Sequence, residues 1–80
     1  MARKPNQHVN YRSVPEHLRK MREGAGLTQR GFAQKIGRPQ WFVARSETGS
    51  RRIDVAEFVD WCAGCGVDPK AALHDLMTRR

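Results

Sequence analysis

The sequence has no long hydrophobic segment. Its longest uninterrupted apolar run covers only residues 41–44, whereas a transmembrane helix needs roughly 20 apolar residues. The polar N-terminus also has no apolar core of the kind found in signal peptides. We therefore expect a cytoplasmic protein with no membrane partner. The 80 residues suffice for one hydrophobic core, so a two-domain enzyme is not expected.

Acidic residues are scarce, and the imbalance is uneven along the chain. Eight Asp and Glu stand against fifteen Lys and Arg, which gives a net charge of +7. Residues 1–52 contain twelve basic and three acidic residues, whereas residues 53–80 contain three basic and five acidic residues. Neutralising phosphates releases counterions and favours nucleic-acid binding, so this distribution favours a polyanionic partner for the N-terminal two-thirds. The alternative is charge that serves only solubility.

The alternating pattern of β-strands and the residues of hairpin turns are also absent, so we expect an all-α fold. Ser13 with Glu16 predicts a capping box at the start of the first helix, and Thr28 predicts an N-cap for the second. Asp54 with Glu57 predicts another capping box. Together with the apolar periodicity, these signals place helices at about 14–24, 28–36, 39–48, 54–64 and 69–77.

The first twelve residues are polar, include Pro5 and show no apolar period. We interpret residues 1–12 as a flexible basic arm. Residues 13–80 are then expected to form one compact domain, within which no internal repeat is visible.

Helical periodicity gives the third and fourth helices distinct faces. In the third helix, Val43, Ser46 and Glu47 fall on the inward side, with Phe42 on a flank. In the fourth, Trp61 lies about 100° from the centre of the apolar stripe, so we expect it on a flank or a partner surface. The outward side of the third helix is expected to hold Trp41, Ala44, Arg45 and Thr48. The apolar stripe of the fourth helix is expected to consist of Val55, Phe58, Val59, Cys62 and Cys65, and that of the fifth helix of Ala72, Leu73 and Leu76.

Two segments joined by a tight turn form the most specific motif. Residues 28–37 are Thr-Gln-Arg-Gly-Phe-Ala-Gln-Lys-Ile-Gly, and residues 39–49 are Pro-Gln-Trp-Phe-Val-Ala-Arg-Ser-Glu-Thr-Gly. With Arg22 and the Cys-Gly-Val-Asp-Pro step at 65–69, they resemble the helix-turn-helix of the Cro and phage-repressor class, the XRE family. The resemblance covers roughly residues 14–76 and implies a compact five-helix, repressor-like DNA-binding domain.

The resemblance also implies a function. Members of this class insert the helix corresponding to residues 39–48 into the major groove of double-stranded DNA. We therefore expect a sequence-specific transcriptional regulator, most simply a repressor, that is nucleoid-associated in a bacterial or phage setting. By the same analogy it binds a palindromic operator as a homodimer through the fifth helix and the loop before it. Neither enzymatic activity nor a cofactor or metal is implied.

In the pose that the family implies, the outward face of residues 39–48 supplies the base contacts, from Gln40, Trp41, Ala44 and Arg45. Gln40 can pair with adenine and Arg45 with guanine, each contact giving about 1–3 kcal/mol of base discrimination. Trp41 stands where the family usually has a small or polar residue. Its bulk either packs against a thymine methyl group or limits how deeply the helix inserts.

Other residues are assigned to the DNA backbone or to the fold. The family positions of Gln29, Arg51 and Arg52 imply contacts to phosphates on the two flanks of the inserted helix. The alternative for each is an ordinary solvated side chain. The resemblance further implies a structural ion pair between Arg22 and Glu47, in which Arg22 can also reach a phosphate.

The sequence also offers residues for two other functions. Trp61, Leu73 and Met77 could form a surface for a protein partner, as in an antitoxin that binds its toxin. Cys62 and Cys65 resemble the Trp-Cys-x-x-Cys of thiol oxidoreductases, but they end a helix instead of beginning one, and the three histidines have no zinc-site spacing to them. We therefore interpret both cysteines as core residues and the histidines as solvated, with no nucleophile supported by a base.

Overall fold

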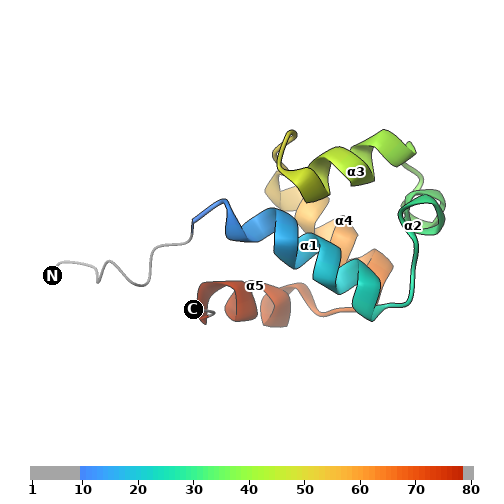
Figure 1. Ribbon diagram of the computed structural model, residues 1–80. Coiled ribbons are helices and arrows are strands. Elements are labelled where there is room, and N and C mark those ends of the chain that lie inside the picture. The colour runs from blue at the N-terminus through green and yellow to red at the C-terminus, as the bar shows by residue number, and fades with distance from the viewer. Residues whose placement is uncertain (1–9, 79–80) are drawn as a thin grey trace, which may run out of the picture.

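Five α-helices and no strand make up residues 10–78, the part of the chain that the computed structural model describes (Figure 1). The expected all-α, five-helix fold is confirmed, and each helix begins and ends within one residue of its expected bounds. Most of the arm expected over residues 1–12 lies outside the described residues. The helices are α1 (Ser13–Gly24), α2 (Gln29–Ile36), α3 (Gln40–Thr48), α4 (Val55–Cys65) and α5 (Pro69–Thr78).

The helix α1 is central to the packing. It contacts α3, α4 and α5, while α2 packs against α3 and α4. Figure 1 shows α3 along one edge of the molecule and α5 along the opposite edge, with α1 between them. No helix in the described part of the chain combines the length and apolar character needed to cross a bilayer.

Local signals set most helix ends. The Thr28 hydroxyl accepts the N–H of Gly31 at 3.0 Å and caps α2. Asp54 and Glu57 form the expected reciprocal capping box at the start of α4. Gly37 has a φ of 70°, the left-handed conformation that glycine adopts without a steric cost, and it makes the turn between α2 and α3.

The predicted capping box at the start of α1 is wrong, because the chain turns earlier than expected. The backbone carbonyl of Asn10 accepts a hydrogen bond from the N–H of Ser13 at 3.0 Å. The side-chain Oδ1 of Asn10 accepts one from the N–H of Arg12 at 3.0 Å. Arg12 occupies the N-cap position without a side-chain cap hydrogen bond. The Tyr11 hydroxyl accepts the N–H of Ile53 at 2.7 Å. This bond ties the end of the expected arm to the loop before α4.

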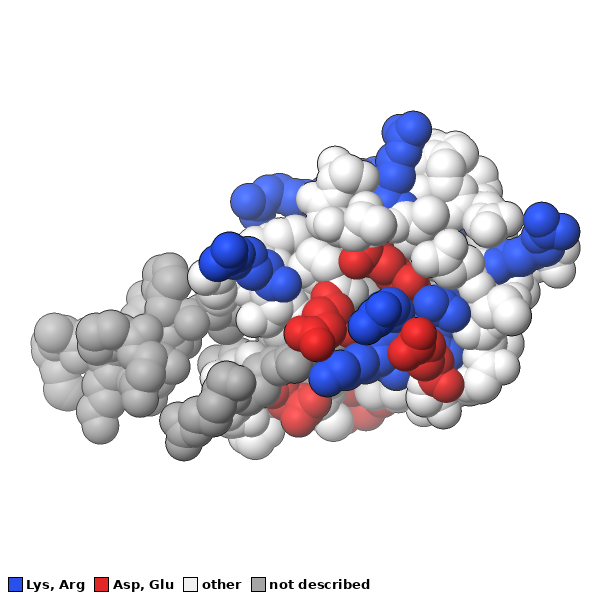
Figure 2. All heavy atoms as spheres, in the orientation of Figure 1, with Lys and Arg blue, Asp and Glu red and all other residues white. Residues whose placement is uncertain are grey.

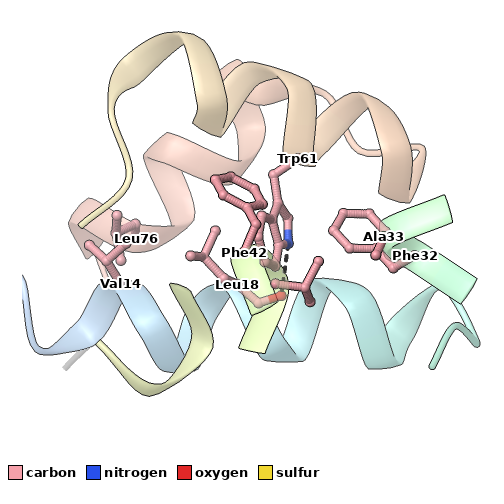
Figure 3. Close-up of a cluster of buried hydrophobic side chains, with 8 residues drawn as sticks. Val14, Leu18, Phe32, Ala33, Phe42, Trp61 and Leu76 are labelled. Carbon is pink, nitrogen blue, oxygen red and sulfur yellow. Dashed lines mark hydrogen bonds between the residues drawn. The ribbon is translucent and has the colours of Figure 1, made fainter. Parts of the chain in front are cut away.

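Trp61 is at the centre of the core, so its placement on a flank or partner surface is wrong (Figure 3). It is 0 % exposed, and its ring lies 4.8 Å from that of Phe32 and 6.1 Å from that of Phe42, centroid to centroid. The indole Nε1 donates to the Leu18 carbonyl at 3.1 Å. The indole therefore joins α4 to α1, α2 and α3 and satisfies its one polar atom.

The face that α4 buries is rotated from the predicted stripe. Val55 is 81 % exposed and Val59 43 % exposed, whereas Cys62 is buried. A Cβ on Gly64 would lie 2.6 Å from the Ile36 side chain, so this glycine lets α4 approach α2 closely. The close approach sets the face of α4 that carries Trp61 against the core.

Three further expectations need correction. Phe42 is 2 % exposed instead of lying on a flank, because the guanidinium groups of Arg38 and Arg51 cover its ring at 4.4 and 4.8 Å. Leu73 is 48 % exposed because α5 turns Ala72 and Leu76 inward. His17 is buried instead of solvated, with its Nε2 lying 3.4 Å from an Asp75 carboxylate oxygen on α5.

Candidate nucleic-acid interface

The helix α3 has a buried face and a free face. Val43, Ser46 and Glu47 are buried against the rest of the domain, as periodicity predicts. The opposite face lies along the edge of the molecule, and α2 crosses α3 near one end (Figure 1). This free face brings together the four expected base-contacting residues, of which Gln40, Trp41 and Arg45 are exposed and Ala44 is partly buried.

Trp41 is the most unusual residue of this face, because 52 % of it is exposed. The Arg45 guanidinium lies over its ring, 5.5 Å from the ring centroid. The ring also meets that of Phe42 edge to face, at 6.5 Å and an interplanar angle of 74°. Trp41 is therefore supported from the core side by Phe42 and flanked on the outer side by a cation.

The expected ion pair between Arg22 and Glu47 is present and forms part of a larger network. Arg22 donates from Nε to Oε2 of Glu47 at 2.6 Å and from Nη2 to Oε1 at 3.0 Å. Its Nη1 donates to the Leu27 carbonyl at 2.7 Å. The hydrogen bond to Glu47 raises the pKa of Arg22, outweighing the effect of burial. The pair fixes the angle between α3 and α1.

Gln29 belongs to the same network. Its Nε2 donates to Oε1 of Glu47 at 3.1 Å, and the residue is partly buried at the start of α2. The first residue of the helix-turn-helix is thereby held in one orientation relative to α3. The sequence marks Gln29 only as a phosphate contact and does not reveal this bond, which spans 18 positions.

Arg51 and Arg52 differ in their surroundings. Arg51 donates to both carboxylate oxygens of Glu57, at 2.9 Å each, and so is already paired. This bond is the largest of the effects that lower the pKa of Glu57 to about 2. Arg52 is exposed, and its guanidinium lies 4.3 Å from the centroid of the Tyr11 ring. Of the two, Arg52 is the more exposed.

A polar groove of about 760 Å³ lies between the starts of α1 and α2 and the end of α3. Arg12, Arg19 and Arg52 line it together with Gln29. Sequence reasoning missed Arg12, which immediately precedes α1, and Arg19 on α1, although their spacing of seven residues places them on one side of a helix. Figure 2 shows basic side chains projecting from the part of the surface formed by α2, α3 and the start of α1, and basic and acidic side chains intermixed over the middle of α1.

The two cysteines on α4 are free thiols. Cys62 is fully buried and Cys65 partly buried. Burial raises the pKa of both thiols, that of Cys65 to about 11, so both are protonated at neutral pH. In the described part of the chain no group of three or more His, Cys, Asp or Glu residues is placed to hold a metal ion.

Comparison with known proteins agrees with this geometry. A family model described as a helix-turn-helix domain matches residues 16–76. A solved structure of an XRE-family like protein from Pseudomonas syringae pv. tomato str. DC3000 is 45 % identical, with a TM-score of 0.78, over 86 % of this chain and 87 % of that chain. No curated protein matches. The chain belongs to the XRE-type helix-turn-helix family of DNA-binding regulators.

Proposed function

We propose that this protein is a sequence-specific transcriptional repressor that inserts α3 into the major groove of duplex DNA. The observation that supports this most directly is the free face of α3, which presents Gln40, Trp41 and Arg45 opposite the helix face buried in the core. The major groove is about 12 Å wide and admits one α-helix. In this pose Gln40 pairs with adenine, Arg45 pairs with guanine, and Trp41 and Ala44 contact neighbouring bases.

The phosphate contacts come from the groove beside α3. Gln29 presents its backbone N–H at the positive end of α2, and Arg52 is exposed next to it along the groove. We add Arg12, at the N-cap of α1, and Arg19 on α1, which line the same groove. Arg51 contributes positive charge to this flank while its own donors hold Glu57.

The proposed assembly is a homodimer on a palindromic operator. Leu73 and Met77 on α5 are 48 % and 50 % exposed, and Val59 on α4 is 43 % exposed. An apolar groove of about 190 Å³, lined on α5 by Leu73 and Leu76, runs between α4, α5 and the start of α1. A second copy that covers these side chains would pair two α3 helices for two half-sites. The second candidate for the partner at this surface is another protein, such as a toxin. Trp61 is buried and does not belong to this surface.

Selection of bound sequences from a random duplex pool, followed by titration at 50 and 200 mM salt, tests the function. With three arginine contacts to phosphates in each copy, and so six in the dimer, affinity is expected to fall on the order of a thousandfold between these salt concentrations. An affinity that hardly changes with salt, or a pool without a consensus, would contradict the proposal.

Two matched arginine variants then test the assigned roles. Arg45→Ala should abolish the preference at one base pair of the consensus. Arg52→Ala should weaken cognate and random duplexes by the same factor and lower the salt slope by about two, one for each copy in the dimer. Equal effects of both variants on cognate and random DNA would refute base recognition by Arg45.

A further inference from the structure

We propose that Trp41 and Arg45 act as one recognition unit for a guanine and the C5 methyl group of a nearby pyrimidine, carried by thymine or by methylated cytosine. This inference rests on the proposed insertion of α3 into the major groove, and it specifies what that helix recognises there.

The exposure of Trp41 calls for an apolar contact that the isolated domain does not supply. Phe42 and Val43, the residues that follow Trp41 in the chain, are at most 2 % exposed. Trp41 itself is 52 % exposed and lies on the free face with the polar residues Gln40 and Arg45. The core already contains a fully buried tryptophan, Trp61. Among the groups on base edges in the major groove, the C5 methyl is the apolar one, and the others are hydrogen-bond donors and acceptors.

The geometry links this apolar contact to a guanine. Arg45 is four residues after Trp41, and its guanidinium carbon lies 5.5 Å from the ring centroid. Stacked bases are about 3.4 Å apart along a strand. When Arg45 pairs with the O6 and N7 atoms of a guanine, the indole therefore lies over a base one or two steps away.

Both members of the unit are held in place before DNA binds. The indole stands edge to face on Phe42, and the Phe42 ring is covered by Arg38 at 4.4 Å and Arg51 at 4.8 Å. The guanidinium of Arg45 rests over the indole through a cation–π contact. An ordered side chain loses less conformational entropy on binding, so recognition of guanine by Arg45 depends on Trp41.

The test uses the selected operator with single thymine-to-uracil replacements, which remove only the methyl group. For the wild-type protein, one such replacement within two base pairs of the guanine recognised by Arg45 should weaken binding about fourfold, the value for one buried methyl-sized group. For Trp41→Ala, uracil and thymine duplexes should bind equally, and discrimination at the guanine should also fall. A second arm replaces that thymine with 5-methylcytosine or cytosine, and the methylated duplex should again bind about fourfold more tightly.

Arg52→Ala is the matched control, because it should weaken every duplex while keeping the fourfold ratio of thymine to uracil. The inference is overturned if no uracil position within two base pairs of that guanine changes the affinity. It is also overturned if Trp41→Ala keeps the ratio, or if the two cytosine duplexes bind equally. Failure of the proposed function would be a different result, namely no consensus in the pool or no steep salt dependence for the wild type.

Discussion

The carboxylate of Glu47 holds three elements of the domain together. It accepts two hydrogen bonds from Arg22 on α1 and one from Gln29 on α2 while lying on α3. Its side chain is 2 % exposed. A buried carboxylate with several donors is a strong orienting element, because a bidentate arginine pair fixes geometry as well as charge. The position of α3 on the surface thus depends on one buried residue, which lies at the wall of the polar groove beside Gln29.

We predict that Glu47→Ala lowers the free energy of unfolding by about 3 kcal/mol, because it leaves the buried Arg22 guanidinium without its partner. Urea denaturation monitored by the fluorescence of the two tryptophans measures this change. Glu23→Ala is the matched control, since Glu23 is an exposed carboxylate 4.0 Å from the same guanidinium, and it should cost less than about 0.5 kcal/mol. Similar losses in the two variants would show that burial of the pair is unimportant.

The acid sensitivity of the domain should depend on Glu57. Its pKa is lowered from the ordinary value of 4.5 to about 2, mainly by Arg51. A carboxyl group with a lowered pKa in the folded state stabilises the fold above its unfolded pKa. This stabilisation is lost as the pH falls from about 4.5 towards 2.

We therefore predict that the wild-type free energy of unfolding declines between pH 5 and pH 3 more steeply than that of Glu57→Gln. Urea denaturation at pH 6, 5, 4 and 3 provides the measurement. Asp60→Asn changes an exposed carboxyl of the same helix and should keep the wild-type slope. Parallel curves for the wild type and Glu57→Gln would argue against the role of Glu57.

At the scale of elements, local signals predicted where helices begin and end but not which face of α4 is buried. Thr28, Gly37 and Asp54 act on their own neighbours in the chain, so their roles could be inferred from the sequence. The apolar period of α4 fits two faces, and the choice between them depends on contact with α2 at Gly64. That contact is non-local, and so the burial of Trp61 could not be inferred from periodicity.

In the candidate site, too, some features follow from the local sequence and others depend on non-local contacts. The two faces of α3 follow from periodicity alone, and the structure brings Gln40, Trp41 and Arg45 to the free face. Pairing of Arg51 with Glu57 depends on the path of the loop before α4, which no short motif specifies. Phosphate-binding positions assigned from motif spacing therefore need the tertiary structure to separate free arginines from paired ones.

We predict that a larger residue at the contact between α2 and α4 destabilises the domain. Gly64→Ala places a Cβ 2.6 Å from Ile36 Cγ2 and 2.8 Å from the Phe32 ring, and such overpacking costs about 1–3 kcal/mol. Gly24→Ala, at the end of α1 with nothing within 4 Å, should be neutral or stabilising. Thermal denaturation of both variants distinguishes them. Equal melting temperatures would mean that α4 can move away from α2 without cost.

At the scale of the whole molecule, most of the strongly exposed apolar side chains of the described residues lie on α4 and α5, and Trp41 on α3 is the exception. The polar groove and the free face of α3 lie on the side formed by α1, α2 and α3, whereas the exposed apolar residues Leu73 and Met77 lie on α5. In the proposed complex, DNA takes the side that carries α3 and a second copy takes the apolar surface of α5.

Self-association through α5 should be sensitive to charge at Leu73. We predict that Leu73→Glu shifts the protein from dimer to monomer in sedimentation velocity, because an ionised carboxylate is costly to bury at an apolar contact. Binding to a full palindrome should then weaken at least tenfold, while binding to a single half-site should stay within twofold of the wild type. Ala71→Glu places the same charge on another side of α5, where Ala71 lines a pocket with His17 and Met21, and should leave the dimer intact. A Leu73→Glu protein that remains dimeric would exclude this face as the contact between copies. A wild-type protein that is monomeric at all concentrations would instead favour a different protein as the partner at this face.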